Sequence, residues 1–277
     1  MSTKLKIAAA VAAAVLLSAC SSPKHEPMPL VKFTPSMEVT EVWSKGLSSA
    51  EGFLVPAVYD DMVFAAGGKT LTRLNARTGE TEWSVSFNSP ITGGVGSDGY
   101  VTAVGLWDGN LEVVDAEGKV SWEKKLTTEL ASPPVVSHGL VIARTMDTRV
   151  SAFEASSGEL QWTYQRSQPA LTVRLPTRML AHDNFLLVGQ PNGHIVILDI
   201  ASGKPMFEFQ VAQAKGVTEV ERLVDVVGAP AFSDNLVCAA AFQGAVTCVD
   251  STNGQTRWTQ KIDAVAGPAI DEDNVYA

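Results

Sequence analysis

Short apolar runs recur along most of the chain, and each is bounded by Gly, Asp, Asn or Ser. This pattern is typical of antiparallel strands joined by tight turns. Residues 133–162 give one example, with apolar runs around Val135, at 140–143 and at 150–155, and a short final run that ends at Trp162. The pattern predicts an all-β chain built from units of four strands.

A glycine and a large aromatic residue recur together at a long period. In the sequence RTGETEW at 77–83, the glycine comes four residues before the tryptophan, and Trp43 fits the same position in an earlier unit. Successive glycines lie 39, 40, 45 and 51 residues apart, and a period near 40 predicts the four-stranded blades of a β-propeller. We expect each glycine to supply a positive φ before the outermost strand, and each aromatic to pack between neighbouring blades. The pairs are Gly79 and Trp83, Gly118 and Trp122, Gly158 and Trp162, Gly203 and Phe207, and Gly254 and Trp258.

The N-terminus lacks this pattern. Lys4 and Lys6 precede an alanine-rich apolar run at 7–17, which has the length of a secretory signal and is too short to span a bilayer. The run ends in Leu-Ser-Ala-Cys, which resembles the bacterial lipobox, whose cysteine is lipidated. The sequence therefore predicts a lipoprotein signal peptide at 1–19 and a lipid anchor at Cys20. A plain signal peptide with a chance cysteine is the alternative.

Residues 20–40 are rich in Pro, Ser and charged residues, and they predict a flexible tether. Ser21, not Asp, follows the cysteine, a pattern that resembles lipoproteins sorted to the outer membrane. The remaining residues, 41–277, are predicted to form a propeller domain in the periplasm.

Composition narrows the classes of function. The net charge of −9 gives the chain no electrostatic reason to bind nucleic acid. Of the three cysteines, Cys238 and Cys248 flank one predicted hairpin, in a compartment where a disulfide could persist. The register of that hairpin cannot be read from the sequence. Two buried free thiols are expected, with a disulfide as the alternative.

Two consecutive connections between the predicted blades are longer than the others. From the aromatic to the turn in the next hairpin, the separation is 14 or 15 residues in three units, but 20 after Trp162 and 26 after Phe207. Consecutive connections of this kind emerge side by side on one rim of a propeller. Loops lengthened on a rigid scaffold commonly carry function. Binding is therefore expected near 169–174 and 216–227.

The candidate binding residues in these loops are Leu171, Val173, Arg174 and Asp225. Arg174 and Asp225 are hard to bury without partners, so they are expected to pair with each other across the loops, to offer their charges to a binding partner, or to do both. In the alternative interpretation, the apolar residues only pack the loops onto the rim: Leu171, Val173, Val220 and Leu223. A short helix is a further expectation, from the spacing of Val217, Val220, Val224 and Val227.

Three stretches resemble known proteins. LNARTGETEW at 74–83 resembles the repeat of pyrroloquinoline-quinone (PQQ) dehydrogenases and their non-enzymatic relatives. PALTVR at 169–174 and GVTEVERLVDV at 216–226 resemble a Leu-x-Leu-Arg motif and a Ser-Thr-Glu-Ile-Asp-Arg-Leu-Ser-Asp segment of the BamB family. These proteins are lipoprotein subunits of the outer-membrane β-barrel assembly machinery. The chain departs from the family pattern at Val173, which replaces a leucine, and at Val227, which replaces an aspartate.

The resemblance implies a non-catalytic scaffold without a cofactor, anchored through Cys20 to the periplasmic face of the outer membrane. It implies that the rim binds the POTRA domains of a BamA-like barrel-inserting subunit, beside other assembly lipoproteins and unfolded outer-membrane proteins. The family propeller has eight blades, whereas about five complete units are visible here, so the chain is expected to be truncated at its C-terminus.

The sequence leaves two alternative functions. A PQQ-dependent dehydrogenase is disfavoured because the chain has no adjacent cysteines, is short for such enzymes, and spreads its histidines over the tether and separate units. No nucleophile motif or phosphate loop is apparent either. A generic periplasmic propeller that binds another protein is the second alternative, since propellers host many functions.

Overall fold

The computed structural model divides the chain into two units, Met1–Glu41 and Val42–Ala277. The residues that it describes are 32, 34, 37–48, 54–167, 169–175 and 177–277. The predicted signal peptide, Cys20 and most of the predicted tether lie outside these residues, so their assignments stay predictions. In the part of the chain that is described, no helix has the length and apolar character needed to cross a membrane.

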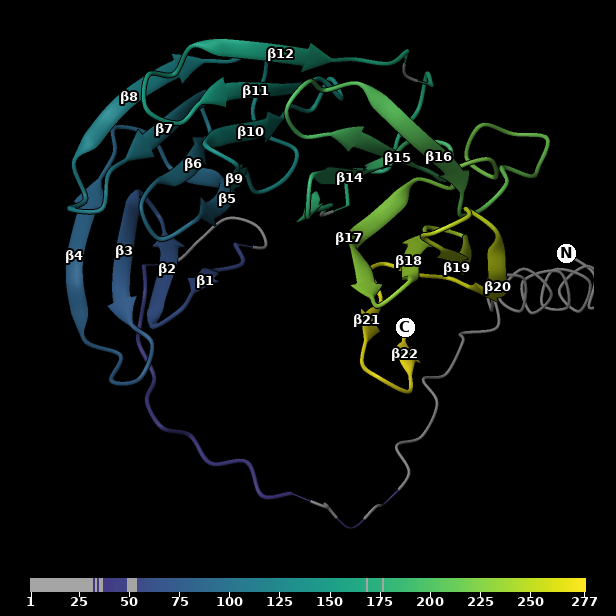
Figure 1. The fold of residues 1–277 in the computed structure, drawn as a ribbon, viewed down its shortest axis with the longest axis horizontal. Helices are drawn as coiled ribbons and strands as arrows, with labels where there is room; N and C mark the ends of the chain where they lie inside the picture. The colour runs from purple at the N-terminus through teal and green to yellow at the C-terminus, as the bar shows by residue number, and fades with distance from the viewer. Residues whose placement is uncertain (1–31, 33, 35–36, 49–53, 168, 176) are drawn as a thin grey trace, which may run out of the picture. The chain divides into compact units, whose positions relative to one another are not determined.

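The unit Val42–Ala277 consists of antiparallel sheets that follow one another in chain order (Figure 1). The first sheet contains β1 (Ala57–Tyr59), β2 (Met62–Gly67), β3 (Thr70–Asn75) and β4 (Thr81–Ser86). The second contains β5 (Ile91–Ser97), β6 (Thr102–Leu106), β7 (Asn110–Val114) and β8 (Val120–Lys125). The third contains β9 (Val135–Ser137), β10 (Leu140–Arg144), β11 (Val150–Glu154) and β12 (Leu160–Tyr164).

The later sheets repeat this plan. The fourth contains β13 (Leu180–His182), β14 (Phe185–Gln190), β15 (His194–Asp199) and β16 (Pro205–Gln210). The fifth contains β17 (Val226–Ser233), β18 (Leu236–Ala241), β19 (Gly244–Asp250) and β20 (Thr256–Ile262). A two-stranded sheet follows, with β21 (Ala269–Ile270) and β22 (Val275–Tyr276). The prediction of an all-β chain made of four-stranded units is confirmed.

Each hydrophobic core cluster lies between two consecutive sheets. Phe64 and Leu71 of the first sheet pack with Ile91 and Val104 of the second, and comparable clusters join the second to the third, the third to the fourth and the fourth to the fifth. A sheet with two apolar faces cannot bury both alone, so neighbouring sheets complete one another. The stacking of the sheets is therefore driven mainly by apolar burial.

The repeated glycine and aromatic meet across these interfaces. The ring of Trp83 lies against Gly118 of the next sheet, where an added Cβ would come within 2.7 Å of the indole. Gly118 also has a φ of +80°, which side-chain-bearing residues rarely adopt. The indole N–H of Trp83 donates to the carbonyl of Ala116 at 2.9 Å. The same arrangement joins Trp43 to Gly79 and Ala76, Trp122 to Gly158 and Ala155, and Trp162 to Gly203 and Ile200.

We call each of these contacts between an aromatic ring and the glycine of the next sheet a joint. The joint at Phe207 departs from this arrangement. Phe207 touches Gly254 with the end of its ring and is 41% exposed, whereas Trp162 at the preceding joint is 9% exposed. A hollow of about 610 Å³ lies here, lined by Phe185, Phe207 and Ser251 among others. Because phenylalanine is smaller than tryptophan and has no N–H, this joint is less completely filled than its neighbours.

We predict that Phe207→Trp stabilises the protein by about 1–2 kcal/mol. The indole would fill part of the hollow and donate to the carbonyl of Ser251, which precedes Gly254 as Ala155 precedes Gly158. Urea unfolding of the variant and of a Phe207→Leu control would measure the gain. An unchanged midpoint for the tryptophan variant would contradict this account of the joint.

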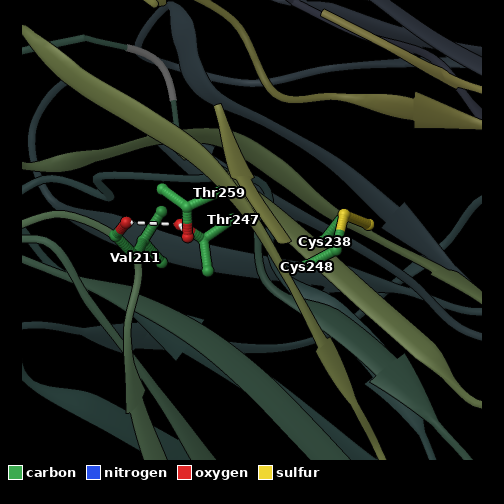
Figure 2. Close-up of a disulfide and its surroundings, with 5 residues drawn as sticks. All are labelled: Val211, Cys238, Thr247, Cys248 and Thr259. Atoms are coloured by element: carbon green, nitrogen blue, oxygen red, sulfur yellow. Dashed lines mark hydrogen bonds between the residues drawn. A yellow bond between two sulfur atoms is a disulfide. The ribbon is translucent and has the colours of Figure 1, made fainter. Parts of the chain in front are cut away.

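A disulfide joins Cys238 in β18 to Cys248 in β19 (Figure 2). The expectation of two free thiols is therefore wrong. The two residues stand directly opposite each other in the β18–β19 register, with both side chains fully buried on one face. Thr247 turns to the other face, and its hydroxyl donates to the carbonyl of Val211 at 2.6 Å (Figure 2). The hairpin therefore also holds the first residue that follows β16.

Glu112 is a buried carboxylic acid in β7, directly opposite Glu123 in β8. Burial, and then the charge and hydrogen bond of Glu123, raise the pKa of Glu112 from 4.5 to about 7. Between these values the folded protein holds a proton that the unfolded chain releases, so this group makes stability fall as the pH rises from about 4.5 to 7.

We predict that Glu112→Gln raises the melting temperature at pH 8 and changes it little at pH 4.5, where the carboxyl is already neutral in the folded protein. Thermal unfolding across this pH range would test it, with the exposed Glu117→Gln as the matched control. An equal shift at both pH values would show that the charge of Glu112 is not responsible.

Candidate functional site

The two longest sheet-to-sheet connections in the described part of the chain follow β12 and β16. They span 165–179 and 211–225, whereas the other three span 87–90, 126–134 and 263–268. The prediction that the extra length lies in two consecutive connections is confirmed. We call 165–179 and 211–225 the rim loops.

The rim loops lie side by side. Thr177 forms an isolated parallel bridge with Gly228, and the backbone N–H of Arg178 donates to the Gly228 carbonyl at 3.0 Å. The backbone N–H of Val173 donates to the Asp225 carboxylate at 2.6 Å. The first rim loop therefore lies against the end of the second and the start of β17.

The buried carboxylate of Asp225 holds the two rim loops together through hydrogen bonds to the backbone. Its side chain is only 7% exposed, and it also accepts the backbone N–H of Asn192 at 3.3 Å, from the turn between β14 and β15. Burial raises the pKa of Asp225, and the two backbone hydrogen bonds and the charge of Arg144 oppose that rise. The chemistry of this residue is that of an internal carboxylate which orders backbone, not that of an exposed charge.

Arg144 is the buried cation that faces this carboxylate, and the sequence analysis did not single it out. It is the last residue of β10, is 5% exposed, and its guanidinium donates to the Thr177 hydroxyl at 3.2 Å. Burial lowers its pKa to about 10, while the charge of Asp225 opposes the change. The available signal was a charged residue directly after the apolar run Leu140–Ala143 of an inner strand.

Arg174 does not pair with Asp225 in the described part of the chain. Arg174 is exposed, no ion pair joins the two side chains, and Asp225 is occupied by the loop backbone. The hypothesis that they pair with each other is therefore wrong. Leu171 is exposed as well, while Val173 is half-buried. Arg174 and Leu171 thus face outward from the first rim loop.

The short helix expected at 217–227 is absent from the described chain, where this segment forms turns followed by β17. The Glu221 carboxylate accepts the backbone N–H groups of Val217 and Thr218 at 2.9 and 3.0 Å, and these bonds lower its pKa. The N–H of Glu221 in turn donates to the Thr218 hydroxyl at 3.3 Å, which completes a capping box, the arrangement that begins many helices. Only one turn follows it, and the chain enters β17 at Val226, where it pairs with β18. Val217 is 97% exposed, whereas Val227 is buried in β17.

The packing interpretation of the apolar loop residues fits them only in part. Val220 is exposed and Leu223 is half-buried, while Val224 is fully buried in the core between the fourth and fifth sheets. Leu171 and Val220 therefore do not serve to bury the loops.

Trp107 is a further exposed residue near the rim that the sequence analysis missed. It lies in the turn between β6 and β7, is 61% exposed, and lines a hollow of about 420 Å³ together with Lys125, Met146 and Arg174. A large exposed aromatic beside an arginine is the composition that protein interfaces favour. Trp107 lies in the hairpin turn of a blade whose length is ordinary, so the sequence gave no sign that it belongs to an interaction surface.

The described side chains contain no group of three His, Cys, Asp or Glu residues that could hold a metal ion. The polar groups of the rim loops include the exposed side chains of Arg174, Arg178, Lys215, Glu219 and Glu221 and the buried carboxylate of Asp225. This arrangement suits recognition of another polypeptide through hydrogen bonds and apolar contact.

Comparison with known proteins places this chain in a family. Residues 67–277 match the family model described as outer membrane protein assembly factor BamB. The protein with that name from Burkholderia pseudomallei is 37% identical over 95% of this chain and 71% of its own length, and that from Bordetella pertussis is 34% identical over 94% and 70%.

Solved structures agree with this placement. The crystal structure of BamB from Moraxella catarrhalis superimposes with a TM-score of 0.73 at 27% identity, over 80% of this chain and 68% of that one. A quinohemoprotein alcohol dehydrogenase from Comamonas testosteroni superimposes with a TM-score of 0.62 at 18% identity, over 78% and 44%, which shows a shared propeller fold alone. The chain belongs to the BamB family of outer-membrane protein assembly factors.

Proposed function

We propose that this protein is a non-catalytic scaffold in the assembly of outer-membrane proteins, and that it binds its partner through the rim loops. The observation that carries the proposal is the outward position of Leu171 and Arg174 on a loop whose backbone is fastened by buried Asp225. A loop held in this way presents its side chains in a fixed arrangement, which favours specific recognition. The names of the relatives support the cellular process.

The partner proposed for this surface is the periplasmic POTRA region of a BamA-like barrel-inserting subunit, as the resemblance of 169–174 and 216–226 implies. Trp107, Leu171 and Arg174 would supply its aromatic, aliphatic and cationic contacts. A lipid anchor at Cys20 on the periplasmic face of the outer membrane would raise the local concentration of the protein beside the machinery. Other assembly lipoproteins and unfolded outer-membrane proteins are further proposed partners.

The test is a calorimetric titration of the full chain, in detergent micelles, with the POTRA region of its own barrel-inserting partner. We expect a dissociation constant in the micromolar range or below. Leu171→Ala and Arg174→Glu should each weaken binding about tenfold or more without changing the melting temperature, because both side chains are exposed. Leu160→Ala, an exposed leucine on the outer strand β12, is the matched control and should bind normally.

Failure of the folded wild-type chain to bind would refute the proposal. Binding that is unaffected by both rim variants would place the partner on another surface, and the rim would then lose its assigned role.

A further inference from the structure

A cavity of about 430 Å³ lies where the rim loops meet the inner strands. Four consecutive sheets or their connections line it. Thr92 of β5 and Ser132 before β9 contribute hydroxyls to the lining. Arg144 of β10 and Gln190 of β14 contribute N–H groups, and Asp225 contributes a carboxylate. The volume is in the range of sites that take small ligands or single side chains.

The polar atoms of this cavity are unusually short of partners. Among the described residues, six buried side-chain nitrogen or oxygen atoms have no hydrogen-bond partner within the protein, and four of them line this cavity. They are Thr92 Oγ1, Ser132 Oγ, Arg144 Nε and Gln190 Nε2. Ser132, Arg144 and Gln190 are each more than nine-tenths buried. A buried polar group left without a partner costs about 1–3 kcal/mol, so their concentration here points to a ligand.

The unpartnered atoms specify the ligand's chemistry. Arg144 Nε and Gln190 Nε2 can only donate, and the two hydroxyls can donate as well. The lining carries two cations, Arg144 and Arg174, against one carboxylate, Asp225, whose oxygens already accept two backbone N–H groups. Arg144 keeps its charge at neutral pH, since its lowered pKa is still about 10. An acceptor-rich anion of planar shape, a carboxylate, complements this set.

We propose that this cavity receives a carboxylate, and that in the assembled complex the carboxylate is an aspartate or glutamate side chain of the partner bound at the rim loops. The second half of this inference rests on the function proposed above. The site and the docking surface are continuous, because Arg174, which is exposed beside Leu171 on the first rim loop, also borders the cavity together with Val173. A partner seated on the rim would thus have the cavity within reach of its side chains.

The first experiment tests the site without the partner. The probe is N-acetyl-glutamate N-methylamide, with N-acetyl-glutamine N-methylamide as the uncharged control, titrated into the full chain labelled with ¹⁵N in detergent. We expect a saturable shift of one arginine Nε–H resonance, identified as that of Arg144 because Arg144→Gln removes it. Shifts of equal size with the glutamate and the glutamine compounds, or no shift with either, would overturn the carboxylate site. Water would then be the hydrogen-bond partner of these polar atoms.

The second experiment tests the source of the carboxylate. Arg144→Gln should weaken binding of the POTRA region about 30-fold, as expected when one member of a buried charged pair is removed. Gln190→Leu, which changes no charge, should weaken it as well and keeps the test valid if Arg144→Gln fails to fold. Arg178→Gln is the matched control, because Arg178 is an exposed arginine of the same loop outside the cavity lining.

The outcomes separate the two proposals. If the wild type binds the POTRA region and both cavity variants bind equally well, the partner's side chain does not enter the cavity, and the scaffold proposal stands. If the probe binds but partner affinity is unchanged, the site serves a free carboxylate, which overturns the assignment to the partner. If the wild type does not bind the POTRA region, the scaffold proposal and the partner assignment fail together, and the probe alone decides whether the carboxylate site exists.

Discussion

Asp225→Ala should lower the free energy of unfolding by about 3–5 kcal/mol, one of the two largest effects that we expect from a single substitution in this protein. The change removes the acceptor of the Val173 and Asn192 backbone N–H groups, and it leaves the buried guanidinium of Arg144 without its counter-charge. Urea denaturation followed by circular dichroism would measure the loss. Asp271→Ala, at an exposed turn aspartate, is the control and should cost far less.

A double-mutant cycle separates the charge from the hydrogen bonds. In an Arg144→Met background the buried cation is gone, so Asp225→Ala should cost clearly less than it does in the wild type. Equal costs in both backgrounds would mean that the carboxylate acts only through the loop backbone. In that case the electrostatic part of the account is wrong, although the fastening of the loops would stand.

Trp162→Ala should destabilise the protein by about 3–5 kcal/mol. Trp162 is buried between the third and fourth sheets, its ring lies against Gly203, and its indole N–H donates to the carbonyl of Ile200 at 2.8 Å. Truncation would empty this joint and leave the carbonyl without its donor. Thermal or urea unfolding would report the change.

Trp258→Ala is the matched control, because Trp258 holds the same place in the repeat but is 38% exposed. It should cost markedly less than Trp162→Ala. Similar losses at the two positions would show that the tryptophans act within their own sheets and not as joints between sheets.

Features set by neighbouring residues were predictable from the sequence. Each turn is encoded by a few local residues, such as Gly79 with its φ of +72°, and each strand by its own apolar run. The repeat, the four-stranded sheets and the two lengthened connections follow from such local information. The rim could be located for the same reason, since only the spacing between repeats was needed.

Features that depend on how distant sheets meet were not predictable. Arg144 ends β10 in the third sheet, and Asp225 directly precedes β17 in the fifth. Only the packed structure brings their charges together. The Cys238–Cys248 bond required the register of one hairpin, which the apolar pattern does not fix to a single residue. The helix expected from the valines at 217–227 does not form, because Val227 pairs with Ala240 of β18 instead.

The second rim loop is held by hydrogen bonds at both of its ends. At one end, Val211 donates to the Gly193 carbonyl at 2.7 Å and accepts from the Thr247 hydroxyl; at the other, Asp225 is held by two backbone amides. A segment ordered in advance loses little conformational entropy when a partner arrives. Complex formation at this surface should therefore show the small ordering cost of rigid-body docking, and not the large unfavourable entropy of coupled folding and binding.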